Sequence, residues 1–479
     1  MDRWVSGQLA DLWTRLPAEL KSQLDGELKK SATSVIGGPL AAARKFVVVF
    51  GFHPAATSVR FHLAEQAARA GRLAEAETDW LTLAGDRDPV VVERAEASLA
   101  ASMKQQGLSD MPATVTWPAE VSIIRAAGSS RSERRFDLLR GRGGLPWFRG
   151  HRCLFDSNRR RLVVERIVDG TRTWSVPLKQ AAAGPTAYFL PVETVGHQLI
   201  LAHRGVIQAL CPVTRRVLWS FPVEGNPRAV SVSSRRQVPP LLKGARGFQQ
   251  LKLANRRASR GPLCVANARY VCVQGRRKLT VLETRTGRVI WQRDHLPQGT
   301  FVCGTEEVVY LQWPAGNDAT SRPPEALRAA DGRPLEVKGL GQRLAGAVRL
   351  AGFEISWVHD TKFFSLPGLP GLEWSQPMLQ CDDVRTGATR WKQRLDAKAY
   401  LGLLDRDHLV QLGPSGQLEL IDLDGGTRAS LGGVKPEDLK GRTSLYAVAD
   451  LDHVYLVLNK PRQGSYYSIN LSSVRVNGM

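Results

Sequence analysis

Residues 282–291 read LETRTGRVIW: a strand-like run, a turn that ends at Gly287, and then Trp291 four residues later. The same phrase recurs at 168–174 (VDGTRTW), 212–219 (PVTRRVLW) and 383–391 (DVRTGATRW). A phrase that recurs along a chain is the mark of a repeat architecture, in which each unit stacks on a copy of itself. The repeat therefore indicates the fold class before any single-residue motif is considered.

Each part of the phrase has a physical reason. The apolar or alternating residues before the turn suit a half-buried strand. The turn glycine supplies the positive φ that a tight hairpin needs. The tryptophan then opens the next strand, where so large a side chain can cover the seam between neighbouring sheets. We assign structural roles in the repeat to Gly170, Trp174, Trp219, Gly287, Trp291, Gly332, Gly387, Trp391 and Gly425.

Degenerate copies without the tryptophan lie at 328–335 and 418–427. Units of about 40 to 50 residues with four strands each are typical of propeller blades. The phrase resembles the repeat of pyrroloquinoline-quinone-like (PQQ-like) β-propellers, the quinoprotein-like superfamily. The resemblance implies a mainly β fold over 112–479: a seven- or eight-bladed β-propeller of four-stranded antiparallel blades. We expect the ring to close by pairing of residues 114–117 with the last blade, through 466–476.

Residues 1–111 have a different pattern and are predicted to form an α-helical domain. Residues 60–107 resemble a tetratricopeptide hairpin, because small residues at Ala64, Ala68 and Ala76 let two helices close up and Pro89 opens a third. Short amphipathic helices are predicted at 4–13 and 17–30. The apolar run 46–50 is far too short to span a bilayer and is predicted to be a buried helix or strand.

The formal net charge of +21 lies entirely on the repeat region, because residues 1–112 carry 13 basic and 14 acidic side chains. Clustered arginines can neutralise phosphates, which favours a polyanion-binding surface. Arginine outnumbers lysine 50 to 16, so a compositional bias explains the same charge. No recognisable nucleic-acid-binding module accompanies it, and nucleic acid is therefore a minor alternative. The arginine clusters lie at 131–135, 140–152, 159–161, 235–236, 256–260 and 276–277.

The six cysteines are widely spaced, at 153, 211, 264, 272, 303 and 381. This spacing favours small buried hydrophobic residues over a disulfide framework or a metal site, although a bridge between Cys264 and Cys272 on neighbouring strands stays open. The sequence contains no CxxC, no HExxH, no GxSxG elbow and no phosphate-binding loop. We therefore assign no catalytic and no metal-binding residue, and no cofactor site is identified.

The PQQ-like resemblance also raises an oxidoreductase hypothesis. Quinoproteins of this type hold PQQ and calcium on the propeller axis, with an Asp as general base and a disulfide between adjacent cysteines. This chain has no adjacent cysteine pair. Its paired acids, Asp382 with Asp383 and Asp422 with Asp424, fall at or beside turns, where a side-chain hydrogen bond to the backbone accounts for them. An enzyme is therefore the less favoured reading, and PQQ and calcium are implied only by the resemblance.

The leading hypothesis is a non-enzymatic binding or scaffold module that mediates protein–protein interaction, with 235–260 and 314–324 as candidate contact loops. The alternatives are a quinoprotein-type oxidoreductase that uses PQQ and calcium, and polyanion binding through the arginine-rich propeller. The first residues contain no secretory signal, which predicts the cytoplasm if the chain is complete. The resemblance implies the periplasm or cell envelope instead. No transmembrane segment is predicted.

Overall fold

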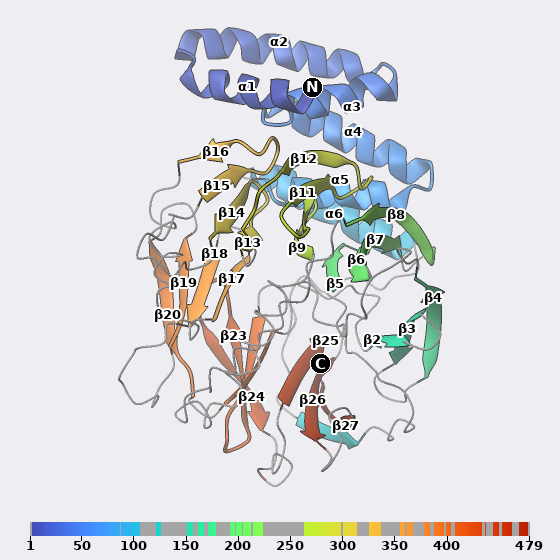
Figure 1. Cartoon of the computed structure of the whole chain (residues 1–479), viewed down its shortest axis with the longest axis vertical. Coiled ribbons are helices and arrows are strands. Elements are labelled where there is room, and N and C mark those ends of the chain that lie inside the picture. Colours follow the sequence, from blue (N-terminus) through green and yellow to red (C-terminus); the bar gives the residue numbers. More distant parts are fainter. Residues whose placement is uncertain are drawn as a thin grey trace.

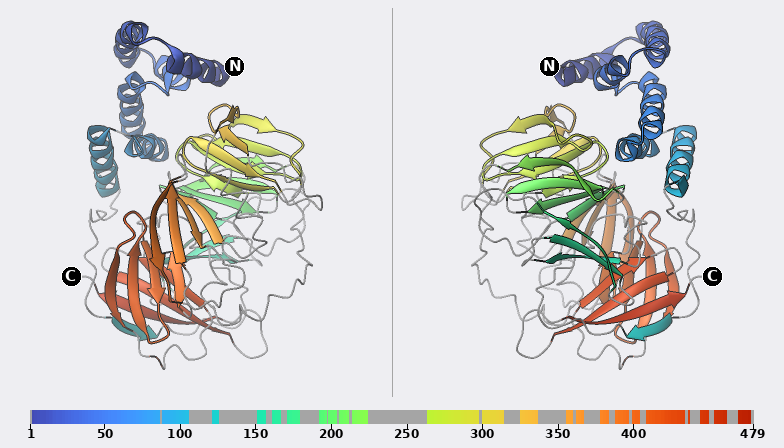
Figure 2. Two further views of the ribbon diagram at one scale, coloured as in Figure 1. Left: turned by 90° about the vertical axis from the view of Figure 1, so that its left-hand side faces the viewer. Right: turned by 90° about the vertical axis from the view of Figure 1, so that its right-hand side faces the viewer.

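The computed structural model describes a helical segment followed by small antiparallel sheets. The described residues are 2–86, 88–105, 121–125, 151–156, 161–166, 171–178, 192–196, 198–203, 205–211, 214–223, 263–297, 300–313, 325–336, 355–359, 362–366, 378–383, 388–396, 399–403, 408–433, 436, 444–449, 453–461 and 469–477. The helices lie on one side of the sheets (Figures 1 and 2).

Six helices make up the helical segment, by which we mean α1–α6. They are α1 (Asp2–Arg15), α2 (Ala18–Ile36), α3 (Leu40–Phe50), α4 (Ala55–Arg69), α5 (Leu73–Ala84) and α6 (Pro89–Gln105). Prolines 17, 39 and 54 directly precede α2, α3 and α4, and Pro89 opens α6, where a missing N–H costs nothing. No helix in the described part of the chain is both long and apolar enough to cross a membrane.

Two apolar clusters hold the helices together. The first joins α2, α3 and α4 around Ala43, Phe46 and Val59. The second joins α4, α5 and α6 around Ala64, Ala76 and Trp80, where alanines without exposed surface let the helices approach closely. The apolar run 46–50 thus forms the end of α3, packed among the other helices, as the sequence predicts.

The described strands form seven small sheets, and every strand pair is antiparallel. This confirms a mainly β chain with helices at its start. The sheets contain β2 (His151–Asp156), β3 (Arg161–Arg166) and β4 (Arg172–Pro177); β5 (Val192–Val195), β6 (Gln198–His203), β7 (Val206–Cys211) and β8 (Arg216–Pro222); β9 (Leu263–Ala266), β10 (Tyr270–Gln274), β11 (Leu279–Glu283) and β12 (Val289–Arg293); β13 (Phe301–Gly304), β14 (Val308–Gln312), β15 (Glu325–Arg328) and β16 (Pro334–Leu335); β17 (Ile355–His359), β18 (Lys362–Leu366), β19 (Met378–Asp383) and β20 (Thr389–Arg394); β21 (Tyr400–Leu403), β22 (His408–Leu412), β23 (Gln417–Asp422) and β24 (Arg428–Gly433); and β1 (Val121–Arg125), β25 (Ser444–Ala449), β26 (His453–Pro461) and β27 (Ile469–Asn477).

The last of these sheets joins the two ends of the strand region. β1 lies beside β27 in antiparallel register, with Val121 opposite Val476 and Arg125 opposite Ser472. The strand that meets the last sheet is thus 121–125, a few residues after the 114–117 expected from sequence, and 114–117 lie outside the described residues. The contact nevertheless ties the start of the strand region to its end.

A bulge recurs at one position in four sheets. Each tryptophan of the repeat phrase lies opposite a residue of the preceding strand, and the register shifts directly after that residue. A bulge bends its strand and increases the local twist. The repeated phrase is therefore also a repeated backbone irregularity at the tryptophan position.

Candidate functional site

The repeat tryptophans lie across the seams between successive sheets. Trp219 Nε1 donates to Thr284 O of the next sheet at 2.8 Å, and Trp291 Nε1 donates to Ala329 O at 2.7 Å. Trp391 Nε1 donates to Asp424 O at 3.1 Å. Each tryptophan thus contacts the turn of the following repeat, whereas the sequence phrase joins it to the turn of its own repeat.

The turn glycines leave room for these rings. A Cβ at Gly287 would lie 2.6 Å from the Trp219 ring, and a Cβ at Gly332 would lie 2.7 Å from the Trp291 ring. Both glycines have positive φ, 67° and 74°. In the turn under Trp391 this position is held by Gly426, with φ of 71°, one residue after the Gly425 that sequence reasoning chose.

Of the remaining repeat residues, Trp174 lies within the described residues and Gly170 and Gly387 do not. Trp174 is buried on β4. Arg215 has a φ of 56° and so takes the glycine conformation in the phrase at 212–219. Gly170 and Gly387 lie outside the described residues, as do the candidate contact loops 235–260 and 314–324 and all the arginine clusters except Arg152, Arg161, Arg276 and Arg277.

The helical segment meets the sheets through buried polar side chains. Asp79 of α5 lies between two arginines: its Oδ1 is 3.3 Å from Arg60 Nη1 of α4, and its Oδ2 is 3.5 Å from Arg285 Nη1, in the turn between β11 and β12. Only 9% of the Asp79 side chain is exposed. Burial raises the pKa of the Asp79 carboxyl, and the two guanidinium groups oppose that shift.

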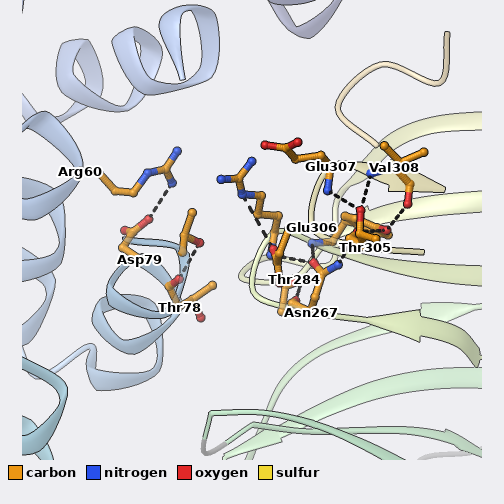
Figure 3. A network of polar contacts seen from close by, with 12 residues as sticks. Arg60, Thr78, Asp79, Asn267, Thr284, Thr305, Glu306, Glu307 and Val308 are labelled. Atoms are coloured by element: carbon orange, nitrogen blue, oxygen red, sulfur yellow. Dashed lines mark hydrogen bonds and ion pairs between the residues drawn. The ribbon is translucent and has the colours of Figure 1, made fainter. Parts of the chain in front are cut away.

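The turns that face Asp79 are joined to one another by hydrogen bonds, as Figure 3 shows. Thr284 Oγ1 donates to Asn267 O at 2.7 Å, and Asn267 Nδ2 donates to Thr305 O at 3.2 Å. These bonds join the β11–β12 turn to the β9–β10 turn, and that turn to the β13–β14 turn of the next sheet. Arg285 therefore lies in a turn that is hydrogen-bonded, through Asn267, to two neighbouring turns.

A second contact lies at the other end of the helical segment. Asp11 of α1 forms an ion pair with Arg328 and lies 3.4 Å from Arg333 Nη1, on either side of the β15–β16 turn. Asp331 of the same turn is 3.3 Å from Arg328 Nη1 and 3.7 Å from Arg333 Nε. Arg328 Nη1 also donates to Gly7 O at 3.0 Å. Two carboxylates thus share two guanidinium groups across the contact.

A third contact lies around Gln198 and Gly196, where the buried side chain of Glu77 also approaches Gly196. Gln198 Nε2 at the start of β6 donates to Thr78 Oγ1 at 2.9 Å and to Ala74 O at 3.2 Å. Leu81 of α5 packs against the apolar cluster of this sheet, and a Cβ at Gly196 would lie 2.8 Å from Leu81 Cδ1. Three successive sheets therefore each contribute one turn region to the helical segment.

Sequence analysis did not identify these contact residues. One signal was present in α5, because Ala76, Trp80 and Leu83 are buried on the face that also carries Asp79. An acid on an otherwise apolar helix face requires a buried partner. The arginines gave no comparable signal, since they do not differ in sequence from the other basic residues of the repeat region.

Five of the cysteines form no disulfide: Cys211, Cys264, Cys272, Cys303 and Cys381. Cys264 and Cys272 lie on the neighbouring strands β9 and β10 without a disulfide, which answers the possibility left open from sequence. Burial raises the pKa of the Cys264 thiol to about 12 and that of Cys272 well above its ordinary value. Thiols held in the protonated form are poor nucleophiles and poor metal ligands. Within the described ranges, no three His, Cys, Asp or Glu side chains gather in a way that could hold a metal ion.

Asp422 has the structural role expected for a turn acid. Its Oδ1 accepts from the Asp424 N–H at 2.9 Å and its Oδ2 from the Gly425 N–H at 3.0 Å. Asp382 is buried and accepts from Gln380 Nε2 at 2.9 Å. These contacts account for both carboxylates without a substrate.

The helical segment also exposes large apolar side chains. Leu12 of α1 is 57% exposed, and Leu20 and Leu24, one turn apart on α2, are 46% and 43% exposed. Leu40 at the start of α3 is exposed as well. We call Leu20 and Leu24, which share one face of α2, the leucine surface.

No family model matches the chain, and no curated protein matches it. Among solved structures, BamB from Moraxella catarrhalis is similar at 13% identity with a TM-score of 0.33, covering 76% of this chain and all of that one. The computationally designed Ika8 protein is similar at 9% identity with a TM-score of 0.38, covering 74% of this chain and all of that one. At these values neither likeness assigns a function.

Proposed function

We propose that this protein is a non-enzymatic scaffold that binds other proteins, built as a seven-bladed β-propeller with a helical segment on one side. The seven sheets would be the blades. β1 would complete the last blade, since it adds a fourth strand beside β27. Such closure removes free sheet edges.

The observation that carries the proposal is the leucine surface. Apolar side chains are worth roughly 25 cal/mol per Å² when removed from water, so a group of exposed leucines favours a partner that covers them. Leu20 and Leu24 are four residues apart and therefore share one face of α2. Both side chains are more than two-fifths exposed, so a partner that covers this face would remove apolar surface from water.

Affinity capture with charge-matched variants tests this proposal. Leu20→Lys with Leu24→Lys should lose the partners that the unaltered chain captures. Ser22→Lys with Gln23→Lys adds the same charge at exposed polar positions of α2 and should retain them. Both variants must keep the helical circular dichroism of the parent. Capture of nothing above background by the parent, or of the same proteins by the leucine variant, would refute the leucine surface as a binding site.

The proposal includes no cofactor. Titration with PQQ and Ca²⁺, followed by calorimetry and visible absorbance, should show neither heat nor a quinone spectrum that co-purifies with the chain. Saturable, stoichiometric binding would instead place the chain with the quinoproteins and overturn the non-enzymatic assignment. The two outcomes separate the leading hypothesis from the oxidoreductase alternative.

A further inference from the structure

The arginines that form ion pairs with the helical segment lie in or beside turns of two successive sheets. Arg285 belongs to the β11–β12 turn, and Arg328 and Arg333 flank the β15–β16 turn. We call these three residues the arginine edge. Each of them binds a carboxylate of the helical segment, Asp79 or Asp11, in a contact that is partly shielded from water. The arginine edge is thus a carboxylate-binding surface that is occupied by the chain itself.

Three charged groups of this contact also have an ion-pair partner on their own side. Asp79 has Arg60 within the helical segment at 3.3 Å. Arg328 and Arg333 have Asp331 within their own turn. Removing one member of a buried ion pair is costly because the other charge is left unpaired. Separation of the two parts would leave Asp79, Arg328 and Arg333 each with an ion pair, whereas Arg285 and Asp11 would lose the ion pairs that they form across the contact. The pairs retained on each side reduce the electrostatic cost of opening.

The rest of the contact lies around Gln198 and Gly196. It includes the Gln198 hydrogen bonds to Thr78 and Ala74, and Leu81 beside Gly196. Polar contacts between domains of one chain resemble transient interfaces. Partly exposed ion pairs such as that of Asp11 are also weakened by salt. The contact between the helical segment and the sheets is therefore polar and sensitive to salt, as expected of a contact that can open and close.

We propose that the arginine edge binds an acidic peptide segment of a partner protein, and that Asp11 and Asp79 occupy it in cis until the partner displaces the helical segment. The carboxylates already present define the chemical class of the ligand. Arg328 and Arg333 together hold the Asp11 carboxylate, an arrangement that suits carboxylates because guanidinium groups donate in a planar fork. A peptide with several Glu or Asp residues carries the same carboxylate groups that both turns already bind.

This inference is independent of the leucine surface, which lies on the helices and contributes nothing to the arginine edge. A chain with Leu20→Lys and Leu24→Lys should therefore bind an acidic peptide as the parent does. If this variant loses partner capture but still binds the peptide, the leucine surface and the arginine edge act separately. If it keeps partner capture but loses peptide binding, the arginine edge is not independent of the leucine surface.

The test compares a locked and an unlocked form of the same chain. Thr78→Cys with Gln198→Cys places one thiol on α5 and one on β6, where the Thr78 and Gln198 side chains now meet. A bis-methanethiosulfonate crosslinker joins the two thiols through reducible disulfides and makes up for the shorter reach of cysteine compared with glutamine. Crosslinking should hold the helical segment in place, and reductant should release it. Each single cysteine variant controls for the native thiols. The probe is a fluorescein-labelled hexaglutamate peptide, measured by fluorescence anisotropy at low salt.

The locked form should bind hexaglutamate at least tenfold more weakly than the same chain after reduction. Asp11→Ser with Gln198→Ala, which removes two contacts without leaving Arg60 unpaired, should bind at least tenfold more tightly than the parent. In that variant, Arg328→Ala with Arg333→Ala should abolish binding. A hexaglutamine peptide should not bind to any form.

Three results would overturn the proposal. Equal affinity of locked and reduced chains would mean that the peptide binds elsewhere on the basic surface. Retained binding after loss of Arg328 and Arg333 would mean the same. A hexathymidylate oligonucleotide that competes as strongly as hexaglutamate would show a general polyanion surface in place of a site for acidic peptides.

Discussion

Gly287 shows how one residue secures a seam between two sheets. It combines a φ of 67° with a Trp219 ring where a Cβ would stand. Gly287→Ala should lower the free energy of unfolding by about 2 kcal/mol or more, because both the backbone and the ring must move. Gly26→Ala is the matched control: open space surrounds the position that a Cβ would take on this helical glycine, and the change should stabilise by about 0.5–1 kcal/mol. Urea denaturation of the two variants measures the difference; an equal effect would contradict the seam contact.

His53 gives the helical segment a pH dependence. It is buried: its Nδ1 accepts from the Ala55 N–H, its Nε2 lies 3.3 Å from Asp25 Oδ1, and the Trp13 ring packs edge-on against it. Burial lowers the pKa of His53 from 6.5, an effect that Asp25 opposes and Lys29 reinforces. The neutral form is thus favoured on folding, so stability is fully present above pH 6.5 and is lost as the pH falls below it.

Melting followed by helical circular dichroism between about pH 7.5 and 5 should show this loss as a falling midpoint. His53→Gln removes the titrating group and keeps a polar side chain, so its midpoint should change less over the same range. Parallel curves for parent and variant would show that other groups set the pH dependence.

At the scale of the element, each repeat depends on a tryptophan that bonds to the next sheet. Trp291→Phe removes the donor to Ala329 O and part of the apolar contact, which should cost about 1–3 kcal/mol of stability. Val289→Thr, an exposed change two residues away on β12, should stay within about 0.5 kcal/mol of the parent. Chemical denaturation of both variants decides whether the seam contact carries this free energy.

Sequence predicted the elements whose cause is local. The Trp phrase and its turns follow from strand alternation and from the need for positive φ, and the helices from their 3.6-residue periodicity and their prolines. Features that depend on distant contacts were not predicted. The strand beside β27 proved to be 121–125, because register depends on a partner about 350 residues away. In the turn under Trp391, Gly426 has the positive φ and Gly425 donates its N–H to Asp422, and adjacent glycines offer no local signal that separates these two roles.

The same reasoning explains why the contact between helices and sheets escaped sequence analysis. Asp11 and Arg328 are 317 residues apart and neither belongs to a motif. Their pairing exists only because α1 and the β15–β16 turn are brought together by the whole molecule (Figure 1). A long-range ion pair of this kind is visible only once the fold is known.

At the scale of the whole molecule, the Asp11–Arg328 pair should couple the first helix energetically to the sheets. A double-mutant cycle of Asp11→Ala and Arg328→Ala should give a coupling of about 0.5–3 kcal/mol in urea denaturation, because the two side chains form an ion pair. Lys29→Ala with Arg328→Ala is the control cycle, since Lys29 pairs with Asp25 on the surface of α2. The control effects should add to within about 0.5 kcal/mol. If the effects of Asp11→Ala and Arg328→Ala are also additive, the ion pair does not couple the first helix to the sheets, and this prediction is refuted.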